Sequence, residues 1–181
     1  MIIDLQPTLV GQRLTMRPML AADWQELFAV ASDPLIWEVH PFNDRWQEHR
    51  FRSYFEEGLA TQGALVAVDN ATGAIIGCSR YANHDAERKE IEIGWTFLAR
   101  SHWGGAYNRD MKSLMLAHAF RFFDSVRFNI GSDNVRSRGA IEKIGARLDG
   151  EYNVTFQERD IPHVIYRISR AQAQTGGMID A

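Results

Sequence analysis

Apolar and polar residues alternate along several short segments of this chain, a pattern typical of β-strands with one buried face. The clearest segment is Glu90–Leu98, whose alternate apolar side chains are predicted to share one face. These side chains are Ile91, Ile93, Trp95 and Phe97. Strand character is also found at Arg13–Pro18, Ala64–Val68, Ala74–Tyr81, Val126–Ile130, Ala146–Thr155 and His163–Ile168. The pattern therefore predicts a sheet of about seven strands, with turn residues at 69–73 joining two of them into a hairpin.

Helical spacing of apolar residues marks four other segments. They are Trp24–Ala31, Arg45–Ala60, Asn108–Phe123 and Asn134–Ile144. Asp23 is placed to cap the first of these helices, and Pro34 is placed to end it. The third segment is apolar nearly all round, which predicts a buried helix. The order β-α-α-β-β-β-α-β-α-β-β predicts an α/β (α+β) fold, a mixed sheet with helices on both faces.

The length and net charge of the chain limit the classes of protein to which it can belong. The 181 residues fit one domain at 1–170, followed by a flexible tail at 171–181. A net charge of −3 gives no basic surface for nucleic acid, and no apolar run is long enough to span a bilayer. The histidines lack the spacing of metal ligands. With no secretory signal pattern and a single cysteine, Cys78, a cytoplasmic protein is expected.

Adjacent glycines lie between the clearest strand and the buried helix. Small residues at Gly104, Gly105 and Ala106 let a ligand approach the main chain closely, and a helix N-terminus favours an anion such as phosphate. A plain glycine-rich turn explains the same residues. A P-loop is excluded because the lysine that should follow its last glycine is missing. A dinucleotide fingerprint is excluded because Asn108 stands where its last glycine should be.

Four segments, in this order and spacing, resemble a known family. They are Glu92–Trp95, Trp103–Tyr107, Asn134–Ser137 and Ala140–Ala146. The family is the GCN5-related N-acetyltransferase (GNAT) superfamily, and the resemblance is to its Rim-type ribosomal-protein alanine acetyltransferase-like branch. It covers nearly the whole chain, from Leu14 to Ile168. The resemblance implies the GNAT fold, a mostly antiparallel mixed sheet in which a pair of strands splays apart at the cofactor site.

The resemblance also implies acetyl-coenzyme A (acetyl-CoA) as cofactor. The family's pyrophosphate loop, Q/R-x-x-G-x-G/A, is matched at Gly104 and Ala106, whereas Ser101 stands where Gln or Arg is usual. The implied cofactor contacts are Trp95, Thr96, Phe97, His102, Trp103, Gly104, Gly105, Ala106, Tyr107, Asn108, Lys112, Asn134 and Ser137. Simpler explanations exist for three of them: Asn134 as a helix cap, Lys112 as a solvated surface lysine and His102 as an exposed loop residue.

Direct attack of an amine on the thioester requires a base and an acid rather than a protein nucleophile. Glu92 is the predicted base, because a carboxylate in a partly apolar cleft can accept a proton, and Glu90 is its same-face substitute. Both also fit a substrate-orienting role. Ser137 and Tyr166 are the predicted acids for the leaving thiolate. A helix-surface serine and a core tyrosine are the alternatives.

The acceptor is expected to be a primary amine, on a small molecule or at a peptide N-terminus. Glu90 and Glu92 favour a cationic acceptor, and Trp37 and His40 are the aromatic residues expected to face it. The resembled family makes a homodimer possible. The competing hypothesis is a sensor that binds acyl-CoA without turnover, which the unusual Ser101 favours.

Overall fold

The computed structural model describes residues 3–156 and 158–180. Within them, one eight-stranded sheet runs in the order β1-β2-β3-β4-β5-β6-β8-β7. The strands are β1 (Leu9–Val10), β2 (Leu14–Pro18), β3 (Ala64–Asp69), β4 (Ile75–Asp85), β5 (Glu90–Leu98), β6 (Ser125–Gly131), β7 (Arg147–Phe156) and β8 (Arg159–Ser169). Neighbouring strands are antiparallel except β5 and β6, which are parallel. The sheet is thus mixed and mostly antiparallel, as the sequence predicted, and the additional strand is the short β1.

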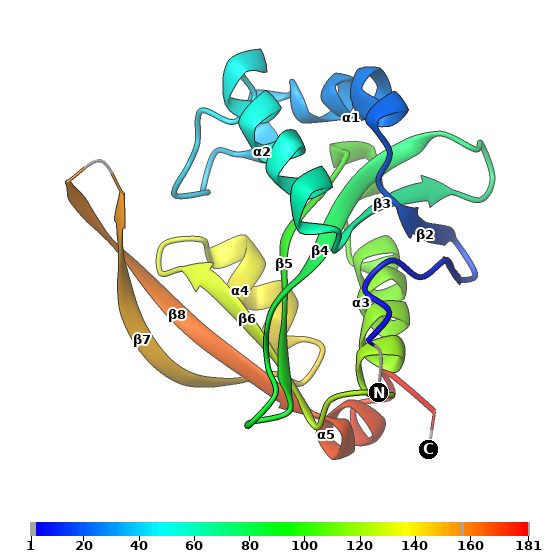
Figure 1. Ribbon diagram of the computed structural model, residues 1–181, viewed down its shortest axis with the longest axis vertical. Coiled ribbons are helices and arrows are strands. Elements are labelled where there is room, and N and C mark those ends of the chain that lie inside the picture. The colour runs from blue at the N-terminus through cyan, green and yellow to red at the C-terminus, as the bar shows by residue number, and fades with distance from the viewer. Residues whose placement is uncertain (1–2, 157, 181) are drawn as a thin grey trace.

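Helices cover both faces of this sheet. They are α1 (Trp24–Ala31), α2 (Glu48–Thr61), α3 (Ala106–Ala119), α4 (Val135–Glu142) and α5 (Arg170–Thr175). Figure 1 shows α1 and α2 together at the top of the view, while the β7–β8 hairpin extends to the left, away from α3. The first four helices were predicted, although α2 begins at Glu48 rather than Arg45. Asp23 does not cap α1 with its side chain, because its carboxylate pairs with Arg17 at 2.8 Å.

Two apolar clusters lie on opposite faces of the sheet. Along β3, Leu65 and Ala67 join the cluster that contains α3, whereas Ala64 and Val66 join the cluster that contains α1 and α2. Successive side chains of a strand point to opposite faces, so this alternation places the two clusters. Burial on both sides explains why β3 reads as a continuous apolar run rather than an alternating one.

The parallel pair β5 and β6 separates partway along its length. Their pairing covers only Glu90 with Ser125, Ile91 with Val126 and Glu92 with Arg127. Beyond these residues β5 stays paired with β4, and β6 stays paired with β8. The splayed pair that the family resemblance implied is therefore present. A gap of this kind leaves main-chain groups without strand partners, and an extended ligand is able to bind there.

A β-bulge interrupts the alternation of β5 and corrects one prediction. Cys78 pairs with Phe97 but Arg80 pairs with Gly94, so on β4 Ser79 alone lies opposite two residues of β5, Trp95 and Thr96. Trp95 takes a left-handed backbone conformation, with φ of 51°. The added residue reverses the faces that follow it. Trp95 and Phe97 therefore pack with α1 and α2, not with Ile91 and Ile93 on the α3 side.

The C-terminal segment differs from the predicted flexible tail. Residues Arg170–Thr175 form α5, which begins with a capping box between Ser169 and Gln172. Ala173 and Met178 are both buried in the cluster that contains α3. The sequence showed little periodicity here, because α5 is only six residues long. Residues as far as Ile179 thus contribute to the core. None of the helices in the described ranges is long and apolar enough to cross a membrane.

Candidate active site

The gap between β5 and β6 opens into a cleft with a volume of about 950 Å³. Its walls come from β5, β6, the start of α3, α4 and the β7–β8 hairpin, and from the loop that precedes α2. We call the part lined by Trp37, His40, Phe42, Arg45, Tyr152 and His163 the aromatic end. The Gly104–Gly105 loop also lines the cleft.

The glycine loop presents the N-terminus of α3 to the cleft. Gly104 and Gly105 have φ of 104° and 105°, a conformation that side chains with a Cβ rarely adopt. A Cβ built at either position meets nothing within 4 Å, so the space beside the loop is open. No side chain caps α3. Its first N–H groups have no partner within the helix, and these groups, with the helix dipole, suit a phosphate. The predicted cradle would consist of these main-chain groups.

Asn134 and Ser137 lie together at the start of α4. The Asn134 Oδ1 accepts a hydrogen bond from the Ser137 N–H at 3.1 Å, so the capping role is observed. Both residues also line the cleft. Arg136, between them, places its guanidinium 4.1 Å from the centre of the Trp103 ring. This cation lies near the glycine loop, at the mouth where phosphates are expected.

Lys112 does not occupy the position that the family resemblance implied. Its side chain is 3% exposed, and Nζ donates to Thr96 Oγ1 at 2.7 Å and to Ser79 Oγ at 3.3 Å. Both hydroxyls also lie beside the Gly94 carbonyl, at the β5 bulge. Burial lowers the pKa of Lys112 to about 7. Lys112 thus fixes the bulge from the α3 side instead of reaching a phosphate at the surface, although it does line the cleft.

The two predicted carboxylates of β5 have different surroundings. Glu92 lines the cleft, and its Oε2 accepts from Asn83 Nδ2 at 2.8 Å and lies 3.7 Å from Arg127 Nη2. Both side chains are buried, Glu92 with 4% and Glu90 with 2% exposed, but Glu90 does not line the cleft. Its carboxylate is held by Arg167 at 2.6 Å. Glu90 is therefore a buried ion-pair partner, which corrects its predicted place beside a substrate.

Two predicted tyrosines are turned away from the cleft. Tyr166 is buried, and its hydroxyl donates to Glu142 at 2.5 Å and accepts from Arg138. It does not line the cleft, so the core alternative describes it and its predicted role as the acid is corrected. Tyr107 donates its hydroxyl to Asp69 at 3.0 Å and likewise does not line the cleft. The strand and helix on which they lie point these side chains toward other partners.

The other predicted residues line the cleft. They are Trp37, His40, Trp95, Thr96, Phe97, His102, Trp103, Ala106 and Asn108. Trp37 is also a core residue, since its Nε1 donates to the Ala31 carbonyl at 2.8 Å. The Trp95 carbonyl accepts from the Tyr54 hydroxyl, so this main-chain oxygen already has a partner. Burial, with Arg45 nearby, lowers the pKa of His40 to about 3, which keeps its ring neutral.

Sequence reasoning missed several lining residues, among them Asn83, Arg45, Tyr152 and His163. The first lies near the end of β4, the second precedes α2 and the last two lie in the β7–β8 hairpin. They come from segments far apart in the sequence, with no motif to connect them. Across the cleft, Phe42 contacts Phe156 with ring centres 4.9 Å apart, so the loop before α2 and the hairpin meet. In the described ranges no group of three or more His, Cys, Asp or Glu residues forms a metal site.

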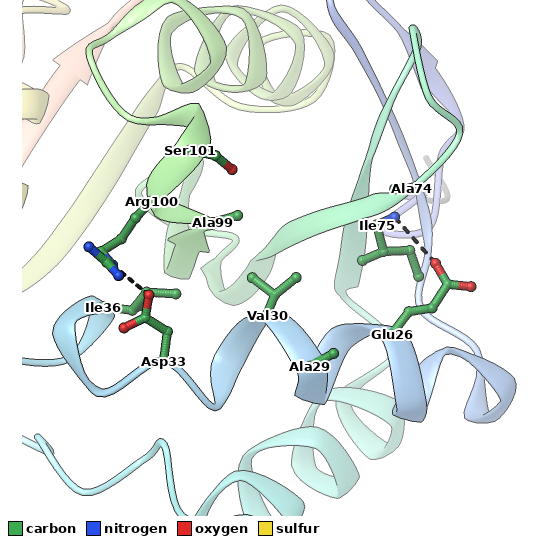
Figure 2. A pocket seen from close by; sticks show the side chains of 10 residues that line it. All are labelled: Glu26, Ala29, Val30, Asp33, Ile36, Ala74, Ile75, Ala99, Arg100 and Ser101. Atoms are coloured by element: carbon green, nitrogen blue, oxygen red, sulfur yellow. Dashed lines mark hydrogen bonds and ion pairs between the residues drawn. The ribbon is translucent and has the colours of Figure 1, made fainter.

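A second hollow, of about 680 Å³, lies beside α1 (Figure 2). Its polar side chains already have partners. Arg100 points toward Asp33, with an ion pair of 2.5 Å, and Glu26 accepts from the Ile75 N–H at 3.4 Å. The remaining walls are largely small and apolar, as Ala29 and Ala99 show in the figure. Both carboxylates of this hollow are thus engaged, and the glycine loop does not line it, so the cleft between β5 and β6 is the candidate active site.

The fold and the cleft together define an α/β protein with an uncapped helix N-terminus beside a splayed strand pair. Residues 13–147 match the family model described as the acetyltransferase (GNAT) domain. This match covers most of the 181 residues. The chain therefore belongs to the GNAT acetyltransferase family.

Solved structures share the fold at low sequence identity. A GCN5-related N-acetyltransferase from Brucella melitensis is 17% identical with a TM-score of 0.80, covering 95% of this chain and 84% of that one. Mycobacterium smegmatis RimJ, in complex with CoA-disulfide, is 18% identical with a TM-score of 0.70, covering 94% and 92%. Vibrio cholerae spermidine N-acetyltransferase, in complex with CoA and spermine, is 14% identical with a TM-score of 0.68, covering 89% and 98%.

Proposed function

We propose that this protein transfers an acetyl group from acetyl-CoA to a primary amine, by direct attack in a ternary complex. The observation that carries the proposal is the combination of the uncapped α3 N-terminus at Gly104–Gly105 with the gap between β5 and β6. Family membership supports it, and the CoA complexes of two structural neighbours make CoA the natural donor.

Different regions of the cleft suit different parts of the CoA molecule. Main-chain N–H groups at the start of α3 are free to bind the pyrophosphate, and Arg136 and Arg109 add positive charge near it. The pantetheine arm fits as an extended segment beside the unpaired part of β5. Asn134 and Ser137 line the opposite wall. These assignments place the thioester near the bulge, whose main-chain N–H groups are suited to polarise its carbonyl.

The amine then needs only orientation and loss of a proton. Its nitrogen attacks the thioester carbon, the new C–N bond forms, and the C–S bond breaks to release the thiolate. Glu92 is the carboxylate that faces the cleft, so we assign it as the acceptor of the amine's proton, directly or through water. Ser137 is the remaining predicted hydroxyl in the cleft that is able to donate to the thiolate.

Thiol release from acetyl-CoA across a panel of primary amines tests the function. We expect amine-dependent release together with a mass increase of the amine by one acetyl group. A sensor would instead bind CoA, seen as thermal stabilisation, without releasing thiol for any amine. A protein that CoA neither stabilises nor binds, by calorimetry, would contradict both functions.

Glu92→Gln tests the base. The substitution keeps the size of the side chain and an acceptor for Asn83 but removes proton uptake, so kcat should fall about 100-fold. The affinity for CoA, measured by calorimetry, should stay within about twofold because Glu92 lies away from the glycine loop. Glu87→Gln, in the exposed turn after β4, is the matched control and should keep wild-type kcat. A loss in kcat of less than about tenfold would remove Glu92 from this role.

A further inference from the structure

The aromatic end of the cleft contains a cation in unusual surroundings. Arg45 lies in the loop before α2, and its guanidinium carbon is 5.0 Å from the centre of the Phe42 ring, 5.1 Å from that of Tyr54 and 5.7 Å from that of Trp37. It lines the cleft. The Arg45 side chain is partly buried, and this burial lowers the pKa of its guanidinium.

In the part of the chain that the structure describes, no carboxylate forms an ion pair with Arg45. The acidic residues nearest to it in sequence and space are engaged with other arginines. Asp44 pairs with Arg50 at 2.7 Å, and Glu57 pairs with Arg80 at 3.1 Å. The polar neighbour of Arg45 is His40 Nε2, at 3.3 Å from Nη1, and the His40 ring is neutral. A neutral ring nitrogen does not balance a guanidinium charge.

A desolvated arginine without an anion is energetically unfavourable, because arginine stays protonated at any physiological pH and a buried charge needs a partner. Aromatic faces compensate for part of this loss. They leave the forked N–H groups in need of acceptors, and a planar carboxylate matches that fork with two parallel hydrogen bonds. A carboxylate that binds this fork would lie in the part of the cleft that Arg45 lines.

We infer that the acceptor amine is an amino acid or a closely related small molecule, whose carboxylate is bound by Arg45 at the aromatic end of the cleft. The inference rests on the proposed function and names its substrate class. The donor's phosphates do not explain Arg45, since the glycine loop and Arg136 already provide for them at the mouth of the cleft.

The same charges argue against the cationic acceptor that the sequence favoured. Of the two acidic residues on which that expectation rested, Glu90 is buried beneath Arg167. Glu92 remains in the cleft, but its carboxylate lies 3.7 Å from the Arg127 guanidinium. One carboxylate near the bulge and one unpaired cation at the aromatic end suit a zwitterion. A polyamine would place a second positive charge beside Arg45.

Matched acceptors provide the test. Several amino acids are compared with their amides and with the amines that lack the carboxylate altogether, and kcat/KM is measured for each. We expect the wild-type enzyme to prefer the acid at least about 50-fold over its amide, as binding of a buried carboxylate by arginine requires. In Arg45→Met this ratio should fall below about fivefold, with Arg45→Lys between the two. Equal use of acid and amide by the wild-type protein would overturn the inference.

Arg52→Met is the matched control. Arg52 also lies against an aromatic ring, 4.0 Å from the centre of Trp24, but it is paired with Glu48 and does not line the cleft. Its loss should leave the acid-to-amide ratio unchanged. CoA affinity and thermal unfolding of each variant establish that it is folded.

Calorimetry of amino-acid binding in the presence of CoA separates this inference from the proposed function. Binding that weakens at least about 20-fold in Arg45→Met supports the carboxylate site even if no acetyl transfer occurs, in which case only the proposed function fails. Transfer to amines without any Arg45-dependent binding of acids leaves the proposed function intact and overturns the carboxylate site.

Discussion

Replacing both glycines of the cradle, in Gly104→Ala/Gly105→Ala, should weaken CoA binding by about 100-fold or more. Each position has φ near 105°, and an alanine there is strained by about 1–3 kcal/mol. The loop is exposed and has room to relax, so the free protein escapes this strain by rotating its main chain. Binding must then restore the original conformation, and the strain is subtracted from the binding free energy. Each 1.4 kcal/mol corresponds to a tenfold loss in affinity.

Calorimetric titration with CoA measures this loss, and thermal unfolding reports on the fold. Gly73→Ala is the matched control, because Gly73 has φ of 74°, has equally open surroundings and lies in the β3–β4 turn outside the cleft. It should lower stability slightly and leave the affinity for CoA within about twofold. A double variant that binds CoA as tightly as the wild-type protein would show that the N–H groups of this loop do not hold the phosphates.

Local signals explain why much of the fold was predictable. The period-two pattern located β5 at Glu90–Leu98 to the residue, and the glycine pair marked the strand-to-helix junction that opens the cleft. The bulge at Trp95 left no such signal. The alternation of apolar and polar residues does not reveal whether a strand holds an extra, bulged residue. The Tyr54 hydroxyl that donates to the Trp95 carbonyl lies in α2, so the sequence of β5 does not reveal this bond. Face assignments beyond the bulge were wrong for that reason.

The site was predictable where it is local and unpredictable where it depends on pairing between distant segments. Apart from Tyr107, the predicted residues beside the glycine loop and at the start of α4 line the cleft. Glu90 and Glu92 look equivalent on β5, and both lie near Arg127; the ion pair with Arg167 of β8 distinguishes Glu90, whereas Glu92 lines the cleft. In the same way, the hydrogen bond from the Tyr166 hydroxyl to Glu142 holds this side chain outside the cleft. Arg45 carried no motif, and its importance follows from rings contributed by its own loop, Trp37 and Phe42, and by Tyr54 of α2.

Lys112→Met should stabilise the folded protein at neutral pH. Lys112 is buried, its neighbours are the hydroxyls of Thr96 and Ser79, and no described carboxylate pairs with it. Burial lowers its pKa from 10.5 to about 7 in the folded protein. Between these two values the unfolded chain binds more protons than the folded one, so stability rises with pH across this window. Methionine fills similar space without a charge, and the two hydroxyls, 2.7 Å apart, still bond to each other.

Urea titrations of the wild-type and Lys112→Met proteins at pH 7 and pH 10 measure the free energy of unfolding and thus the sign of this effect. The lysine penalises folding most strongly at and below pH 7 and ceases to do so above pH 10.5, so the advantage of Lys112→Met should shrink as pH rises. The shift corresponds to a change on the order of 4 kcal/mol across the window. Lys89→Met removes an exposed lysine paired with Asp124 and should show no such pH dependence. Two results would contradict this prediction: a Lys112→Met protein that is less stable than the wild type at pH 7, or a difference in unfolding free energy that does not change with pH. Either would mean that a charged Lys112 stabilises the fold, because its contacts at the bulge outweigh its desolvation.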